Sequence, residues 1–220
     1  MAGDERKTNP CDLVCSEARN NQAEERKLSS ATASAFSHVF AETPPAFGMS
    51  VMINTIAKKY KSVPGLSTDV VYKWLQEIHQ QGKSNKQHLL LCDIRPPHEY
   101  NISHIPGALQ LDPDILDMKA VQQLLITHAR KNEFPSDAEV KVVMYCSVGY
   151  RSSVMVNRYL ESHKQKLIDE DTFKLFNLEG SIFKWGNEKR PLVDKDEQIT
   201  QLVHPFSPMW GKMLFKDIRA

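Results

Sequence analysis

The sequence predicts an α/β fold, with a parallel sheet covered by helices on both faces. Strand-like and helical segments alternate along residues 62–194, and this order is typical of parallel strands joined by helices. The segment His88–Cys92 is apolar without alternation, as expected of a central strand that is buried on both faces. With 220 residues, the chain is long enough for one such domain and extensions at its ends.

The composition argues against several classes of partner. Twenty-eight Lys and Arg against 27 Asp and Glu give a net charge of +1, so neither nucleic acid nor a charged membrane surface is expected as a partner. No apolar run is long enough to span a bilayer. The first ten residues carry acids and lack the apolar core of a signal peptide, and four cysteines are too few for a disulfide framework. We therefore expect a cytoplasmic protein in a reducing compartment.

Residues 1–46 are polar and end in Thr43-Pro44-Pro45, a composition that predicts a disordered N-terminal lead. Cys11 and Cys15 lie in this lead. No second pair of Cys or His residues follows them at the spacing of metal ligands, so we expect no metal site.

Residues 47–61 are expected to form a helix that packs on the domain, because their apolar residues recur at nearly helical spacing. A helix lying on a membrane surface is the alternative, but the apolar stripe is short and the basic residues are few. The apolar positions are Met49, Met52, Ile53, Ile56 and Tyr60.

The first half of the domain, from residue 62, contains two longer helices around one strand. Ser67 or Thr68 can cap a helix that ends at Gly82. The strand His88–Cys92 then brings Asp93 to its C-terminal end, and the prolines that follow stop it, which predicts a short helix. A turn into a short strand covers Ile105–Leu109, and an amphipathic helix comes next. The inward positions of the two longer helices are Val70, Val71, Trp74, Leu75 and Ile78, then Ile115, Met118, Val121, Leu124, Leu125 and His128.

The second half of the domain, to residue 194, repeats the pattern. After the segment 140–160, Phe173–Leu178 reads as the last strand and Ser181–Glu188 as a short helix, which Pro191 ends. Residues 195–220 form a tail whose apolar side chains would cost free energy in water, so we expect this tail to pack back on the domain.

The segment 140–160 carries the strongest functional signal. An apolar run leads to Cys146, a short loop holds Gly149 and closes on Arg151, and a helical pattern begins at once. A thiol at such a junction faces backbone N–H groups and a helix N-terminus, and has an arginine beside it, so its thiolate is favoured. We therefore predict Cys146 and Arg151 as catalytic residues. The substrate-binding loop is Ser147, Val148, Gly149 and Tyr150.

Asp93 is expected at the same edge of the sheet as Cys146, because ligands of open α/β sheets bind outside the C-terminal ends of the strands. We expect Asp93 and Arg95 to support the loop as scaffold, with Arg95 forming a structural ion pair with Glu99. Cys92 could form a disulfide with Cys146. Alternation along a strand, however, points Cys92 and Asp93 to opposite faces, which favours core packing of Cys92.

Three stretches together resemble the rhodanese-like sulfurtransferases. They are Asp93-Ile94-Arg95 with Glu99-Tyr100, then His104-Ile105-Pro106-Gly107-Ala108, then the loop from Cys146 to Arg151; residues 178–182, with Trp185 and Pro191, are similar to the element that closes the family's domain. The resemblance covers residues 62–194. It implies a single domain with an open five-stranded parallel sheet and a cysteine that carries a persulfide. The sequence departs from the family pattern at Ser103 and Ser181, where glycine is frequent.

Loop length separates two chemistries that this fold supports. Four residues lie between Cys146 and Arg151, whereas phosphatases built on the fold have a loop one residue longer, with room for a phosphate. The shorter loop favours sulfur transfer over phosphate hydrolysis.

The resemblance thus implies a sulfurtransferase that needs no cofactor. Cys146 would take sulfur from thiosulfate or a persulfide and pass it to a thiol, cyanide or a protein, while Arg151 holds the anionic end of the donor. The alternative is a rhodanese-fold binding or regulatory module with little turnover. Such modules commonly lack the cysteine, so the presence of Cys146 and Arg151 favours an enzyme.

Overall fold

The computed structural model describes residues 47–81 and 87–220. The predicted N-terminal lead, with Cys11 and Cys15, lies outside the described residues, as does the predicted helix end at Gly82. The core is a five-stranded, wholly parallel sheet in the order β1-β5-β4-β2-β3, so the predicted fold class is confirmed. The strands are β1 (Gly65–Leu66), β2 (His88–Asp93), β3 (Leu109–Gln110), β4 (Val140–Tyr145) and β5 (Phe173–Leu178).

The central strands β2 and β4 are buried on both faces, which explains their unbroken apolar sequences. Alternate side chains enter two separate cores: Leu91 and Val143 point into one, and Cys92 and Met144 into the other. The strands pair in register, with Cys92 opposite Met144 and Asp93 opposite Tyr145. The last residues of β2 and β4 therefore lie side by side at the C-terminal edge of the sheet.

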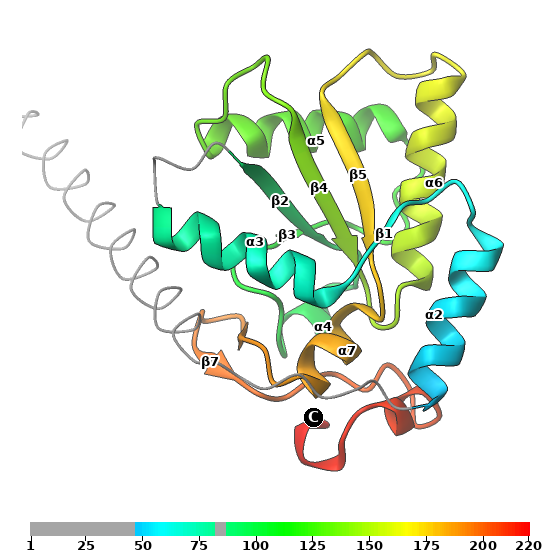
Figure 1. Cartoon of the computed structure of the whole chain (residues 1–220), viewed down its shortest axis with the longest axis vertical. Helices are drawn as coiled ribbons and strands as arrows, with labels where there is room; N and C mark the ends of the chain where they lie inside the picture. Colours follow the sequence, from blue (N-terminus) through cyan, green and yellow to red (C-terminus); the bar gives the residue numbers. More distant parts are fainter. Residues whose placement is uncertain (1–46, 82–86) are drawn as a thin grey trace, which may run out of the picture.

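Helices cover both faces of the sheet (Figure 1). On one face, α5 (Met118–Lys131) and α6 (Tyr150–Lys164) supply Val121, Leu125 and Val156 to the core that contains Cys92. On the other face, α3 (Thr68–Gln81) and α7 (Ser181–Asn187) supply Val71 and Trp185. The helix α2 (Phe47–Lys59) joins this second core.

The segments that flank the sheet also contribute to the second core. Met49 of α2 is fully buried in it, and so are Val203, Leu214 and Ile218 from the C-terminal end of the chain. The smaller elements are α4 (Pro97–Tyr100), an antiparallel pair of β6 (Leu192–Val193) and β7 (Ile199–Thr200), and two 3-10 turns, η2 (Trp210–Met213) and η3 (Lys216–Ile218).

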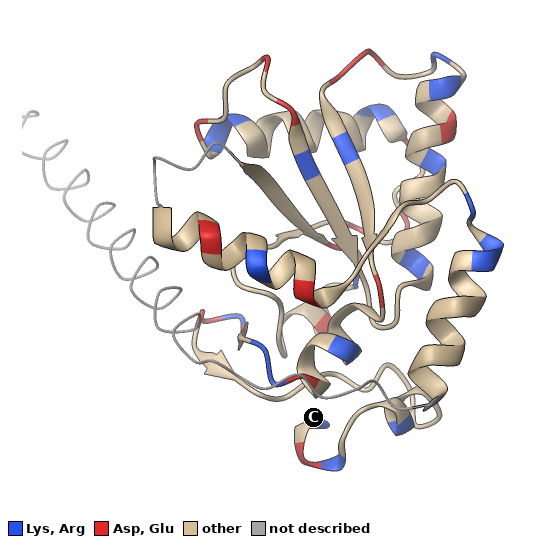
Figure 2. Cartoon of the chain, viewed as in Figure 1, with Lys and Arg blue, Asp and Glu red and all other residues tan. Residues whose placement is uncertain are grey.

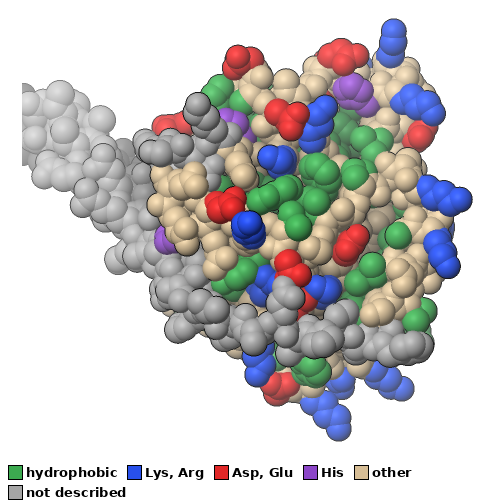
Figure 3. Space-filling model, viewed as in Figure 1, with side chains coloured by type: hydrophobic (Ala, Val, Ile, Leu, Met, Phe, Trp, Pro, Cys, Tyr) green, Lys and Arg blue, Asp and Glu red, His purple; other side chains and the backbone are tan. Residues whose placement is uncertain are grey.

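Charged residues of both signs are interspersed over the described part of the chain (Figure 2), and on the face seen in Figure 3 they surround apolar side chains. Within the described ranges, no helix is long and apolar enough to cross a membrane.

Candidate active site

The candidate active site is the loop that joins β4 to α6, next to the centre of the sheet. Cys146 follows the last residue of β4, and α6 begins at Tyr150. Gly149 turns the chain between them with a φ of 105°, a left-handed conformation that glycine adopts without strain. A Cβ atom here would also lie 3.2 Å from the amide nitrogen of Asn177. The loop therefore requires glycine at this position.

The Cys146 sulfur has two polar neighbours within the loop and the first turn of α6, although the residue is only 1% exposed. The Gly149 N–H donates to Sγ at 3.2 Å, and the Ser152 hydroxyl lies 3.6 Å from it. Burial by itself raises the pKa of the Cys146 thiol. The charge of Arg151 and hydrogen bonds from Ser152 and Gly149 outweigh that effect, so the pKa lies below the usual cysteine value. The loop thus favours a thiolate.

The N-terminus of α7 holds the loop backbone from the other side. The N–H groups of Ile182 and Phe183 donate to the carbonyls of Cys146 and Ser147, each at 3.1 Å. Ser181 has a φ of 49°, which is costly for a residue with a side chain. Its hydroxyl, however, accepts the Cys146 N–H at 3.1 Å and donates to the Leu178 carbonyl. The serine that departs from the family pattern therefore fixes the position of the cysteine.

Arg151 is held by Glu99, a residue of α4. The two guanidinium nitrogens of Arg151 donate to the two Glu99 carboxylate oxygens at 2.9 and 3.1 Å, and one of them also reaches the Ser147 hydroxyl at 2.8 Å. Ser147 in turn donates to Glu99 at 3.0 Å. Burial raises the pKa of Glu99, but Arg151 and other groups lower it by more, so the carboxylate is ionised at neutral pH. Such a bidentate pair orients the arginine beside the thiol.

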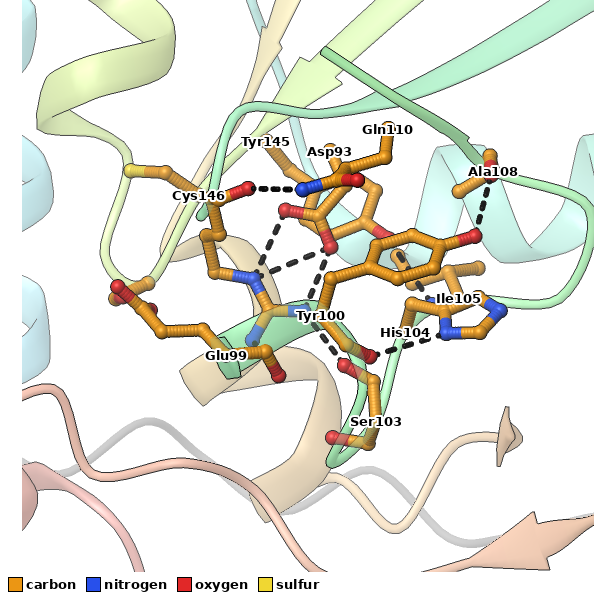
Figure 4. A network of polar contacts seen from close by, with 12 residues as sticks. Asp93, Glu99, Tyr100, Ser103, His104, Ile105, Ala108, Gln110, Tyr145 and Cys146 are labelled. Carbon is orange, nitrogen blue, oxygen red and sulfur yellow. Dashed lines mark hydrogen bonds and ion pairs between the residues drawn. The ribbon is translucent and has the colours of Figure 1, made fainter. Parts of the chain in front are cut away.

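Asp93 and Arg95 form a separate buried pair beneath the loop. Two nitrogens of Arg95 donate to the Asp93 carboxylate, the shorter bond being 2.6 Å, and Arg95 also donates to the Ser103 carbonyl (Figure 4). Asp93 lies beside β4 as expected from the strand ends. The Asp93 carboxylate, however, accepts hydrogen bonds from Arg95. The Cys146 side chain points away from Asp93 (Figure 4).

The predicted ion pair between Arg95 and Glu99 is wrong. Arg95 reaches only the backbone carbonyl of Glu99, at 3.4 Å, whereas the Glu99 carboxylate binds Arg151. The reason is local: α4 begins at Pro97, so Arg95 lies before the helix and the two side chains do not share a helical face.

A cavity of about 410 Å³ opens over the loop. The loop and the first turn of α6 contribute Cys146, Ser147, Val148, Tyr150 and Arg151. The opposite walls come from α2 and from the C-terminal end of the chain. These last residues are Met52, Thr55, Ile56, Lys59, Phe206 and Trp210.

Cys92 does not join this site. It is fully buried in the core between the sheet and the helices α5 and α6, so core packing was the right alternative. Burial and the nearby Asp93 charge raise the pKa of its thiol. Within residues 47–81 and 87–220, no group of three or more His, Cys, Asp or Glu residues is arranged to hold a metal ion.

The partners that come from distant elements are not predicted by the sequence. Asn177 of β5 accepts a hydrogen bond from Ser152 at 2.7 Å and thereby positions the hydroxyl near the sulfur. Ser152 directly follows Arg151, so its place in the sequence was a usable signal. Nothing in the sequence near Phe206 or Trp210 indicates that these residues reach the site.

The fold and the site define a parallel α/β domain with a buried cysteine, whose thiol pKa is lowered, in a loop between a central strand and a helix. The sequence model of the rhodanese-like domain matches residues 72–188, and the chain belongs to this family. A curated protein named "Sulfurtransferase" from Allochromatium vinosum is 30% identical over 117 residues, which cover 53% of this chain and 90% of that protein. At the level of the family, these matches support a sulfurtransferase.

Solved structures show more remote similarity. Ygr203w of Saccharomyces cerevisiae, described as a homolog of single-domain rhodanese and the Cdc25 phosphatase catalytic domain, aligns with a TM-score of 0.44 at 17% identity, over 60% of this chain and 88% of that one. A thiosulfate sulfurtransferase from Pseudomonas aeruginosa aligns with a TM-score of 0.44 at 14% identity, over 75% of this chain and 26% of that one.

Proposed function

We propose that the protein is a sulfurtransferase that carries a sulfane sulfur as a persulfide on Cys146. The observation that carries the proposal is the buried Cys146 sulfur, whose pKa is lowered by Arg151 and by two hydrogen-bond donors, and which borders a cavity large enough for a small ligand. The sulfurtransferase relative in the same family supports the same conclusion.

The reaction is a double displacement. The Cys146 thiolate attacks the outer sulfur of a donor, thiosulfate or a persulfide. A sulfur–sulfur bond forms, and the bond within the donor breaks, so that sulfite or a thiolate leaves with the electron pair. An acceptor thiolate, cyanide or protein thiol then attacks the outer sulfur of the persulfide. The Cys146 thiolate leaves and is ready for the next cycle.

Arg151 has two roles in this scheme. Its charge stabilises the Cys146 thiolate, and the same charge attracts the anionic end of a donor. Glu99 acts as a positioning residue, since its carboxylate fixes both outer nitrogens of the guanidinium. Because two of the arginine's N–H groups are thus occupied, a donor meets an oriented cation rather than a mobile one.

Each of the other residues in and next to the loop has a separate role. Gly149 provides the turn and an N–H for the sulfur, Ser147 links Arg151 to Glu99, and Val148 and Tyr150 border the cavity. Asp93 and Arg95 are scaffold, because both side chains are fully buried and pair with each other.

The test is mass analysis of the intact protein after treatment with thiosulfate or with a low-molecular-weight persulfide. We expect wild type to gain the mass of one sulfur atom and to lose it when cyanide or a thiol is added. The variant Cys146→Ser should gain nothing. A gain by Cys146→Ser equal to that of wild type would refute the assignment.

A further inference from the structure

The walls of the cavity over Cys146 come largely from outside the part of the chain that matches the rhodanese-like domain. The matching part of the chain runs from residue 72 to residue 188. The helix α2 lies before it and contributes Met52, Thr55, Ile56 and Lys59 to the cavity. The C-terminal end lies after it and contributes Phe206 and Trp210. In Figure 1 the blue end of α2 and the red C-terminal segment meet at the same edge of the molecule.

These walls are fixed in place by the core of the domain. On the α2 side, Ile56 is 5% exposed. Hydrogen bonds hold the C-terminal segment before and after its two cavity residues. The Val203 N–H donates to the Ile218 carbonyl at 2.7 Å. The Asn187 side chain donates to the Met213 carbonyl and accepts the Phe215 N–H. The cavity is therefore preformed, so a ligand need not order its walls.

Phe206 covers the arginine of the site. Its ring centre lies 4.9 Å from the guanidinium carbon of Arg151, and its backbone has a φ of 60°, a conformation that costs free energy for a residue with a side chain. Arg151 is thus contacted by Glu99 and Ser147 at its nitrogen edge and by an aromatic ring. Fewer of its N–H groups are therefore left for the anionic end of a donor.

The charge of the cavity fits a single negative group. Lys59 and Arg151 are the cations among its described lining; Glu99 pairs with Arg151, and the Cys146 thiolate adds a second negative charge, so the lining has no surplus positive charge for a dianion. Lys59, whose ammonium donates to the Tyr150 hydroxyl at 2.9 Å, is the cation available to a single negative group. The other α2 and C-terminal wall residues are apolar apart from Thr55. A small dianion moved into such surroundings loses hydration that the cavity does not replace.

We propose that the cavity selects sulfur donors in which the transferable sulfur is attached to an apolar organic body with one negative charge, and discriminates against small dianions such as thiosulfate. The proposal rests on the proposed function, because it assigns a class of donor to the same cysteine. The volume of about 410 Å³ lies within the range of organic ligand sites and leaves thiosulfate mostly without contacts.

Benzenethiosulfonate is a suitable probe of this class. It is a monoanion with an aromatic ring and a terminal sulfur. The Cys146 thiolate attacks the terminal sulfur, a sulfur–sulfur bond forms, and the bond from that sulfur to the sulfonyl sulfur breaks. Benzenesulfinate leaves with the electron pair, and Cys146 holds the persulfide. Methanethiosulfonate undergoes the same step with the same charge but lacks the apolar body.

The experiment measures the second-order rate constant of persulfide formation on the full chain with these two donors. Each constant is divided by that of the same donor with glutathione in solution, which removes the difference in intrinsic reactivity. We expect the normalised constant to be at least about tenfold higher for benzenethiosulfonate than for methanethiosulfonate, because the ring fills an apolar site. Thiosulfate should be slower than both.

Two wall variants and one matched control locate the effect. Thr55 is exposed on α2, so Thr55→Phe fills the cavity without altering the core, and Trp210→Ala removes a wall. Both should reduce the preference for the aromatic donor to within about threefold. Met209→Ala is the control, because Met209 adjoins Trp210 in the chain, is 68% exposed and is not among the lining residues. It should retain the preference.

The outcomes separate this proposal from the function on which it rests. Equal normalised constants for the two donors, or a preference that Thr55→Phe and Trp210→Ala leave intact, would overturn the proposal while persulfide on Cys146 still supports a sulfurtransferase. If neither donor forms a persulfide on Cys146, the proposed function itself is refuted.

Discussion

Cys92 and Cys146 show how two buried thiols at the ends of neighbouring strands acquire opposite shifts in pKa. Cys92 is the penultimate residue of β2, Cys146 directly follows β4, and both are at most 1% exposed. Cys92 points into an apolar core and has the Asp93 charge nearby, so its pKa is raised. Cys146 faces a loop N–H, a serine hydroxyl and Arg151, so its pKa is lowered despite burial. Burial alone therefore does not decide the direction of the pKa shift; the groups that surround the sulfur do.

The two arginine–carboxylate pairs also differ in their surroundings, because only one of them borders the cavity. The side chains of Asp93 and Arg95 are both fully buried, and their contacts are internal to the scaffold. Arg151 pairs with an equally buried Glu99 but keeps 26% of its side chain exposed, and it borders the cavity. The first pair is internal to the scaffold, whereas the second lies where, in the proposed function, its arginine meets a donor.

The largest effect on reactivity is expected from replacing Cys146, and little effect is expected from replacing Cys92. Cys146→Ser should abolish rapid alkylation by iodoacetamide at neutral pH and reduce sulfur transfer by at least about 10³-fold, because the nucleophile is lost. Cys92→Ala should leave both within about threefold of wild type. Alkylation rates and peptide mapping measure this difference. Slow alkylation of Cys92→Ala and fast alkylation of Cys146→Ser would show that Cys92, not Cys146, is the reactive thiol.

The next largest effect comes from Arg151. Arg151→Met removes the charge that lowers the pKa of Cys146, so the midpoint of the alkylation rate against pH should move upward, and the rate at neutral pH should fall about tenfold for each unit of movement. Sulfur transfer should fall about 10²-fold, since donor binding is lost as well. Arg151→Lys should restore part of the midpoint shift. An unmoved midpoint in Arg151→Met would show that the arginine does not tune the thiol.

Glu99→Gln sharpens the distinction between charge and position. The arginine charge remains, but it loses its bidentate partner, so sulfur transfer should fall about tenfold while the alkylation midpoint does not rise. A midpoint as high as that of Arg151→Met would instead mean that Glu99 is needed for the charge effect.

The stability difference between wild type and Glu99→Gln should depend on pH. The pKa of Glu99 is lower in the folded chain than in the unfolded one, so its pairing stabilises the fold above the usual glutamate pKa, and this contribution disappears as the pH falls through the lowered value. The difference in unfolding free energy between wild type and Glu99→Gln should be about 1–3 kcal/mol at neutral pH and approach zero in acid. Urea unfolding at several pH values measures it; a difference that grows in acid would contradict the assignment.

The smallest effect on reactivity is expected from Arg95→Met. It leaves the buried Asp93 carboxylate without its partner and should reduce the free energy of unfolding by about 3 kcal/mol or more. The alkylation midpoint of Cys146 in the folded protein should stay as in wild type. A large shift of that midpoint would place Asp93 and Arg95 in the site rather than in the scaffold.

The sequence predicted what lies close together in the chain. Cys146, Gly149 and Arg151 occupy one short loop, so their spacing alone indicated a reactive thiol, and the apolar runs indicated the parallel sheet. The partner of Arg151 could not be found in this way, because Glu99 lies 52 residues earlier and reaches the loop only through the pairing of β2 with β4. The cavity walls likewise depend on how α2 and the C-terminal segment pack, which local patterns do not specify.

The most direct test of the account is to locate the transferred sulfur. The full chain is treated with a sulfur donor, its thiols and persulfides are trapped by alkylation, and peptides containing each of the four cysteines are analysed by mass spectrometry. We expect one added sulfur per chain, on Cys146, and its removal by an acceptor thiol. Sulfur on Cys92 or another cysteine, or none on Cys146 with any donor, would contradict it.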